Sequence, residues 1–253
     1  MTKPAYSQFN LFIRSLLFSM YSLTSIIIYS IIVIFAIVLP LKWRHAIIRQ
    51  FLRTYLIVLK YLCHIDYHIE GLENIPDNRA GIVMCKHQST WETFMLPLLF
   101  HDPAPIAKRE LLWVPFFGWG LAAADPIVIN RSDKASAMQQ IIDKGRKCLD
   151  QGRWIMVFPE GTRVAPGTVG KYKLGGARLA AATGYPVMPV AHNAGRCWPK
   201  RKFIKQPGTI QVAIGPLIES KDRTSEEILK LTKDWIEDTM LSIDRFVDKT
   251  ASQ

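Results

Sequence analysis

A histidine and a carboxylate five residues apart could together activate a hydroxyl group. His87 follows a short apolar run, 81–85, that predicts a buried strand, and the polar residues after His87 predict the start of a helix. Within one helix, two residues five positions apart would point roughly 140° away from each other. With His87 in the loop before the helix and Glu92 in its first turn, the carboxylate can instead reach back to the imidazole. The pair would then be a general base and its orienting group.

No Ser or Cys in this stretch has to be the nucleophile, so a substrate could supply the hydroxyl group itself. A histidine beside a helix start also commonly caps the helix or packs in the core. This stretch alone therefore leaves the role of His87 open.

A second motif, Phe-Pro-Glu-Gly-Thr-Arg at 158–163, predicts a tight turn directly after another buried strand. Gly161 lets the backbone turn sharply. Arg163 offers a planar pair of donors that suits a phosphate group, and backbone amides of such a turn can add to the site. Glu160 could accept a hydrogen bond from a hydroxyl group or steady an arginine. Taken alone, the motif is only weak evidence for a phosphate-binding turn, because Arg163 could equally be a surface charge.

Four blocks in this order resemble the lysophospholipid acyltransferase superfamily, most closely the bacterial 1-acylglycerol-3-phosphate acyltransferases. Residues 86–92 look like the family's His-x4-Asp block, and residues 126–131 look like its second block, which ends in Arg131. Residues 158–163 match the Glu-Gly-Thr-Arg block, and 186–190 look like the fourth, with Pro189 as its proline. The resemblance covers roughly residues 67 to 215 and the type of N-terminal segment.

The resemblance implies that His87 deprotonates the free hydroxyl of 1-acylglycerol 3-phosphate, which then attacks an acyl thioester to give phosphatidate. It implies that Glu92 orients His87 and that no covalent acyl-enzyme forms. It implies no metal and no cofactor, with acyl-carrier protein or coenzyme A carrying the acyl chain as the thioester co-substrate. The substrate-binding residues that it implies are Lys108, Arg131, Glu160, Gly161, Thr162 and Arg163.

The sequence departs from the family pattern in two places. Glu92 stands where the family usually has Asp, and its longer side chain can still reach the imidazole. The second block ends in Asn130-Arg131 rather than Asp-Arg, with Asp125 at a position where Gly is expected. These departures bear on the head group of the acceptor more than on the reaction. Two other functions stay open: an acyltransferase for another acceptor (glycerol 3-phosphate, a lysophospholipid with a head group, or an amino-lipid), and a non-catalytic membrane protein that binds lipids.

The chain of 253 residues is strongly basic, with a formal net charge of +11 and a pI of about 9.6. The sequence contains no recognisable nucleic-acid-binding motif, which argues against nucleic acid as the partner. The charge instead suits an anionic membrane surface, an anionic lipid or an acidic carrier protein.

The four cysteines are widely spaced and are expected to be reduced thiols in a cytosolic compartment.

The N-terminal quarter predicts membrane association. Residues 15–39 contain no charged residue over 25 positions, and about 20 residues suffice to span a bilayer. More basic residues follow this run than precede it, which places the next domain on the cytoplasmic face of the inner membrane. Pro40 marks a break, and residues 45–62 form a basic amphipathic pattern. That pattern fits a helix in the membrane interface or an ordinary helix packed on the core. A transmembrane span and a re-entrant helical hairpin stay equally possible.

Strands that alternate with helices after residue 65 predict an α/β fold, with a mixed, mostly parallel sheet flanked by helices. The alternating stretch 209–214 is expected to be an antiparallel or edge strand. We therefore predict two parts: a membrane anchor of one transmembrane or re-entrant helix and one amphipathic helix at 1–64, and an α/β glycerolipid acyltransferase domain at 65–253.

Overall fold

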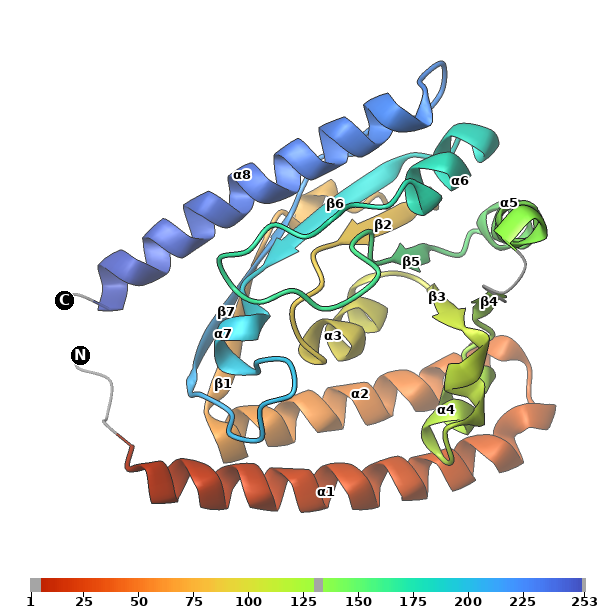
Figure 1. The fold of residues 1–253 in the computed structure, drawn as a ribbon. Helices are drawn as coiled ribbons and strands as arrows, with labels where there is room; N and C mark the ends of the chain where they lie inside the picture. Colours follow the sequence, from red (N-terminus) through yellow and green to blue (C-terminus); the bar gives the residue numbers. More distant parts are fainter. Residues whose placement is uncertain (1–5, 130–133, 252–253) are drawn as a thin grey trace.

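The computed structural model of the chain describes residues 6–129 and 134–251, and a seven-stranded sheet lies at the centre of this part (Figure 1). The strands lie side by side in the order β1-β7-β6-β2-β5-β3-β4, and the pairing is parallel except between β6 and β7. This confirms the predicted mixed, mostly parallel sheet. The strands are β1 Ile65–Glu70, β2 Ile82–Cys85, β3 Ala104–Lys108, β4 Ile127–Ile129, β5 Ile155–Val157, β6 Val187–His192 and β7 Gly208–Ile214.

Helices cover both faces of the sheet (Figure 1). The helices α2 Leu41–Cys63 and α3 Trp91–Leu99 lie on one face, with the long α1 Gln8–Phe35 packed outside α2. The helices α5 Lys134–Asp150, α6 Gly175–Thr183 and α8 Ser225–Ala251 lie on the other. The shorter helices are η1 Ala36–Val38, η2 Leu72–Asn74, η3 Arg109–Trp113, α4 Phe117–Ala123 and α7 Ala194–Cys197.

The central strand β2 is buried on both faces because its side chains alternate between two cores. Val83 and Cys85 belong to the core under α2 and α3, whereas Ile82 and Met84 belong to the core under α5 and α6. A strand of this kind is a continuous apolar run, as the sequence of β2 is. The strand is therefore held firmly on both sides, and the loop that leaves its carboxyl end starts from a fixed point.

The strand β7 is antiparallel to β6, as predicted, but it is not an edge strand. It also pairs in parallel with β1, which forms that edge of the sheet. The strand β1 adds to the sheet outside β7, so of the two expected arrangements, antiparallel or edge, β7 has the antiparallel one.

The helix α2 packs on the core of the α/β domain, which decides between the two interpretations of residues 45–62. Leu59 is fully buried, and the ring of Tyr55 stacks on Phe94 of α3 with 4.2 Å between ring centroids. Arg49 donates hydrogen bonds to the carbonyls of Leu98 and Phe100, at the end of α3. The amphipathic pattern of α2 thus reflects packing against α3 and the sheet.

The helix α1 lies along the domain and is attached to it near both ends. The side chain of Arg14 donates to the carbonyl of Leu62, and Ser15 accepts a hydrogen bond from the backbone amide of Lys205. Toward the other end, the hydroxyl of Ser30 donates to the carbonyl of Phe116. The outer face of α1 exposes large apolar side chains, and residues 8–38 are long and apolar enough to cross a membrane.

Candidate active site

The loops after β2 and β5 meet at the carboxyl edge of the sheet, where parallel α/β folds commonly place their sites. The loop after β2 carries His87, and the loop after β5 carries the turn 158–163. The backbone amide of Val164 donates to the carbonyl of His87 at 2.8 Å, which joins the two loops directly. Two motifs that lie about seventy residues apart in the chain are therefore neighbours in space.

His87 and Glu92 form the predicted pair. The Nδ1 atom of His87 lies 2.8 Å from Oε1 of Glu92, which sits in the first turn of α3. The same oxygen accepts hydrogen bonds from the backbone amides of Gln88 at 3.0 Å and Ser89 at 2.8 Å. These donors, together with the positive end of the helix dipole, stabilise a carboxylate that is almost fully buried.

The imidazole of His87 is held flat against the ring of Phe158, with 4.1 Å between ring centroids and an angle of 20° between the planes. Its side chain is 14% exposed, so part of the ring faces solvent. Because Nδ1–H donates to Glu92, the other nitrogen, Nε2, carries the lone pair. The arrangement can accept a proton from a hydroxyl group that approaches from solvent.

A second histidine, His192 at the end of β6, supports this loop, and sequence analysis did not single it out. Its Nε2–H donates to the carbonyl of Lys86 at 2.8 Å, and its Nδ1 accepts from the amide of Ala194 at 3.1 Å. Complete burial lowers the pKa of His192, which keeps the ring neutral and suited to this pattern of one donor and one acceptor. The sequence gave little indication of this role, because a histidine at the end of a buried strand can serve many purposes.

Glu160 was predicted to contact substrate, but its side chain is turned into the protein. Its side chain is fully buried, with Oε2 accepting from the amide of His87 at 2.7 Å and Oε1 lying 3.0 Å from Nζ of Lys86. Burial raises the pKa of this carboxyl group, although Lys86 and the His87 amide act in the opposite direction. Glu160 therefore holds the backbone of His87. This role takes the place of the predicted contact with the glycerol phosphate.

The rest of the turn faces outward. Gly161 has a positive φ of 66°, and its amide closes the turn by donating to the carbonyl of Phe158 at 2.9 Å. Thr162 is exposed and Arg163 is half-buried. Nζ of Lys200 lies 3.2 Å from the hydroxyl of Thr162 and 2.8 Å from the carbonyl of Arg163. The sequence gave no reason to connect this lysine with the turn, because it belongs to no motif.

Lys108 and Arg131 are the two other cations that were predicted to bind substrate. Lys108 is exposed at the carboxyl end of β3, two strands from β2, at the same edge of the sheet as His87. Arg131 lies outside the described residues. Among residues 6–129 and 134–251, no group of three His, Cys, Asp or Glu side chains is arranged to hold a metal ion.

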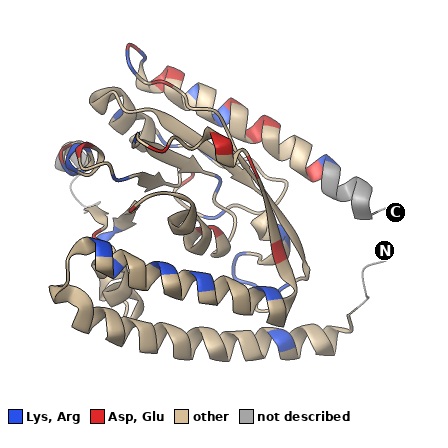
Figure 2. Cartoon of the chain, turned by 180° about the vertical axis from the view of Figure 1, so that it is seen from behind, with Lys and Arg blue, Asp and Glu red and all other residues tan. Residues whose placement is uncertain are grey.

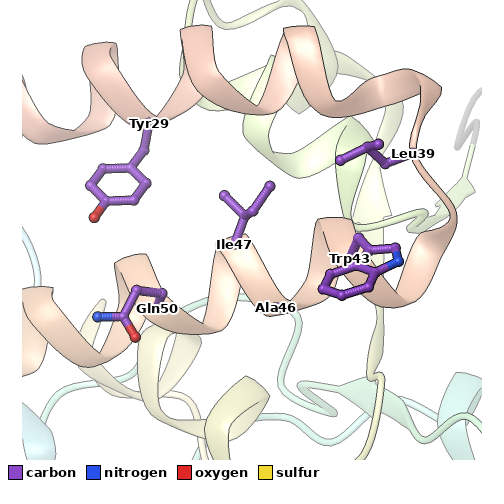
Figure 3. A pocket seen from close by; sticks show the side chains of 6 residues that line it. All are labelled: Tyr29, Leu39, Trp43, Ala46, Ile47 and Gln50. Carbon is purple, nitrogen blue, oxygen red and sulfur yellow. The ribbon is translucent and has the colours of Figure 1, made fainter.

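An apolar pocket of about 340 Å³ lies between α1 and α2, away from His87. Figure 3 shows the side chains of Ile47 and Trp43 rising from α2 toward α1, with Tyr29 descending from α1. Separately, the segment formed by η3 and α4 exposes the large apolar side chains of Trp113, Val114, Phe117 and Trp119. Both features lie on the side of the molecule that carries α1.

Comparison with known proteins agrees with the motifs. A family model described as acyltransferase matches residues 66–193. The chain is 41% identical over 236 residues to the 1-acyl-sn-glycerol-3-phosphate acyltransferase of Pseudomonas aeruginosa, covering 91% of each chain. It is 30% identical over 200 residues to the human 1-acyl-sn-glycerol-3-phosphate acyltransferase alpha, covering 78% of this chain and 70% of the human protein. The crystal structure of the 1-acyl-sn-glycerophosphate acyltransferase PlsC from Thermotoga maritima superposes with a TM-score of 0.78 at 26% identity, covering 92% and 95% of the two chains. The predicted relationship is confirmed, and the chain belongs to the acyltransferase family.

Proposed function

We propose that this acyltransferase moves a fatty acyl chain from a thioester to the sn-2 hydroxyl of 1-acylglycerol 3-phosphate, giving phosphatidate. The observation that carries the proposal is the His87–Glu92 pair, partly open to solvent and joined through the His87 backbone to the turn 158–163. The names of the relatives from Pseudomonas aeruginosa and human favour the same acceptor.

In this mechanism Nε2 of His87 takes the proton of the acceptor hydroxyl as its oxygen attacks the thioester carbonyl. Glu92 stabilises the imidazolium that forms. The tetrahedral intermediate then collapses, the carbon–sulfur bond breaks, and the imidazolium returns its proton to the departing thiolate. Because the thioester is already activated and the proton is returned, the reaction needs no cofactor. The co-substrate is an acyl-carrier protein thioester or an acyl coenzyme A.

The acceptor phosphate would lie on the outward side of the turn 158–163. Arg163 can supply a bidentate contact, and the exposed Thr162 can add a hydroxyl donor. Lys108 at the same edge of the sheet and Arg131 complete the proposed set of phosphate ligands, while Gly161 permits the turn itself. A phosphomonoester without a head group would pair most completely with these cations, because all of its terminal oxygens are accessible.

The acceptor preference can be tested with Arg163→Ala. We expect the KM for 1-acylglycerol 3-phosphate to rise by about tenfold or more, because a charge-assisted contact to phosphate contributes about 1.5–3 kcal/mol. The KM for the acyl thioester should stay the same. Steady-state kinetics with both substrates varied measure this, with the exposed Lys221→Met as a charge-matched control.

A panel of acceptors then decides between the alternatives. The proposal requires faster transfer to 1-acylglycerol 3-phosphate than to glycerol 3-phosphate or to lysophospholipids with a head group. Equal rates with all three acceptors would leave a general acyltransferase and refute the proposed acceptor.

We further propose that α1 and its exposed apolar face sit in the inner membrane, with the catalytic domain on the cytoplasmic face. In Figure 2 basic residues recur along α2, whereas α1 is almost free of them. The contacts from Arg14 and Ser30 hold α1 along the domain, which favours a re-entrant or in-plane hairpin over a span.

Cysteine labelling in sealed vesicles tests this arrangement. A Thr2→Cys variant should react with a membrane-impermeant maleimide from the cytoplasmic side, because α1 would not carry the N-terminus across the bilayer. The four native cysteines are buried, so they should add little background. Labelling of Cys at position 2 from the periplasmic side alone would establish a transmembrane span instead.

A further inference from the structure

A group of four interacting side chains connects α8 with the loops of the active site. This group, the Lys86 cluster, consists of Lys86, Glu160, Tyr172 and Glu237. Nζ of Lys86 lies 3.0 Å from Oε1 of Glu160 and 2.7 Å from Oε1 of Glu237, and it also donates to the carbonyl of Thr168 at 3.3 Å. The hydroxyl of Tyr172 donates to the same oxygen of Glu237 at 2.7 Å. One buried cation is thus held between two carboxylates.

Stability alone does not account for such a cluster. The side chains of Lys86 and Glu160 are 1% and 0% exposed, and moving charges out of water costs several kcal/mol for each ion. Apolar residues of similar volume commonly give equal or greater stability at such positions. Ion pairs between buried groups do, however, fix the groups around them in one arrangement. Its value therefore lies in what it holds in place.

What the cluster holds is the backbone of His87. Glu160 accepts a hydrogen bond from the His87 amide at 2.7 Å through Oε2, while its other oxygen faces Lys86. Lys86 precedes His87 in the chain, and its own carbonyl accepts from His192. Both polar groups of the peptide bond between Lys86 and His87, the carbonyl and the N–H, are thus held by side chains from other elements.

The far end of the cluster is anchored by α8, which runs along the sheet over β6 (Figure 1). Ile236 of α8 is fully buried and belongs to one small core with Ala191 of β6. Glu237, the next residue, is 18% exposed at the side chain and points its carboxylate at Lys86. The C-terminal helix thereby presents one carboxylate at a defined place beside the active site.

We propose that Glu237 and Lys86 are positioning residues for His87. Glu237 orients Lys86, Lys86 holds the Glu160 carboxylate on the His87 amide, and the imidazole is thereby aligned with the turn 158–163. Neither residue touches substrate. The inference rests on the proposed function in one respect, namely that His87 is the base of the acyl transfer.

Glu237→Gln tests the inference by removing one charge with little change in shape. Since a misplacement of about 1 Å can cost about a hundredfold in rate, we expect kcat to fall on the order of tenfold or more. The KM values for both substrates should stay within about twofold, because no binding contact is lost. Asp238→Asn is the matched control, since Asp238 is the exposed neighbour on α8, and its kcat should equal that of the wild type.

The Lys86→Met background shows whether Glu237 acts through Lys86. If it does, adding Glu237→Gln to Lys86→Met should cause no further fall in kcat, because the connection is already broken. An independent, additive fall in the double variant would overturn the inference. So would a kcat of Glu237→Gln within about twofold of the wild type.

A readout that does not depend on turnover separates this inference from the proposed function. The rate at which diethyl pyrocarbonate modifies His87, followed by peptide mass spectrometry, should rise in Glu237→Gln while exposed His68 reacts as before. Unchanged modification of His87 would count against positioning even if the wild type proved inactive with every acceptor.

Should Glu237→Gln fail to fold, Tyr172→Phe keeps all three charges and removes one hydrogen bond to Glu237. The same fall in kcat is expected there, and wild-type kinetics would overturn the inference.

Discussion

His87→Ala is expected to abolish phosphatidate formation while leaving the fold intact. A positioned general base contributes about 10²–10⁴-fold to the rate, and the other histidine of the site, His192, is buried with both ring nitrogens occupied. The ring of His87 packs on Phe158 at the surface of the site, so its removal should leave no large cavity in the core. Initial rates of phosphatidate formation, together with the far-UV circular dichroism spectrum, measure both effects.

The control for this variant is His68→Ala. The side chain of His68 is 61% exposed on the edge strand β1, so its removal should change neither the rate nor the fold. A folded His87→Ala protein that still transfers acyl chains would show that the assigned base is wrong.

Glu92→Gln should lower kcat by about 10²–10⁴-fold, because the imidazolium loses the anion that stabilises it. It should also destabilise the protein. Three N–H groups converge on Oε1 of Glu92, from the His87 ring and from the amides of Gln88 and Ser89. A glutamine amide cannot satisfy all of them, and each unpaired buried donor costs about 1–3 kcal/mol. Steady-state kinetics and chemical denaturation in detergent measure the two losses separately.

The comparison variant is Glu92→Asp, which keeps the charge and shortens the side chain by one methylene group. It should retain much more activity than Glu92→Gln, since a carboxylate at this place in the helix can still face the imidazole. Equal activities of the two variants would mean that the charge of Glu92 has no part in the reaction.

The His87–Glu92 pair could be predicted because it is local. A buried strand, a short loop and a helix start fix the geometry of residues 86–92 within a few positions of one another. The sheet could be predicted for a similar reason, since strands buried on both faces, such as β2, are continuous apolar runs.

The supports of the site could not be predicted because they are distant in the chain. Glu237 lies 151 positions from Lys86, and His192 lies 106 positions from the same residue. The motif at 158–163 indicated a carboxylate beside an arginine. It carried no information on which way Glu160 turns, since that direction is set by Lys86 and the His87 amide.

The helix α2 illustrates the limit of periodicity. An apolar stripe with interleaved basic residues fits a membrane interface and a protein core equally well. The choice depends on what the stripe meets, and here Tyr55 meets Phe94 of α3 while Arg49 meets the end of the same helix. Tertiary contacts of this kind are not encoded in the pattern of a single segment.

The most direct measurement is a phosphatidate assay with the purified full-length protein, 1-acylglycerol 3-phosphate and either acyl coenzyme A or an acyl-carrier protein thioester. We predict that phosphatidate and free thiol appear in equal amounts in the presence of at least one donor, and that neither appears above background once the His87 imidazole is removed. Thiol release without phosphatidate, or product formation that ignores the loss of that ring, would contradict the assignment of His87 and Glu92 as the catalytic pair.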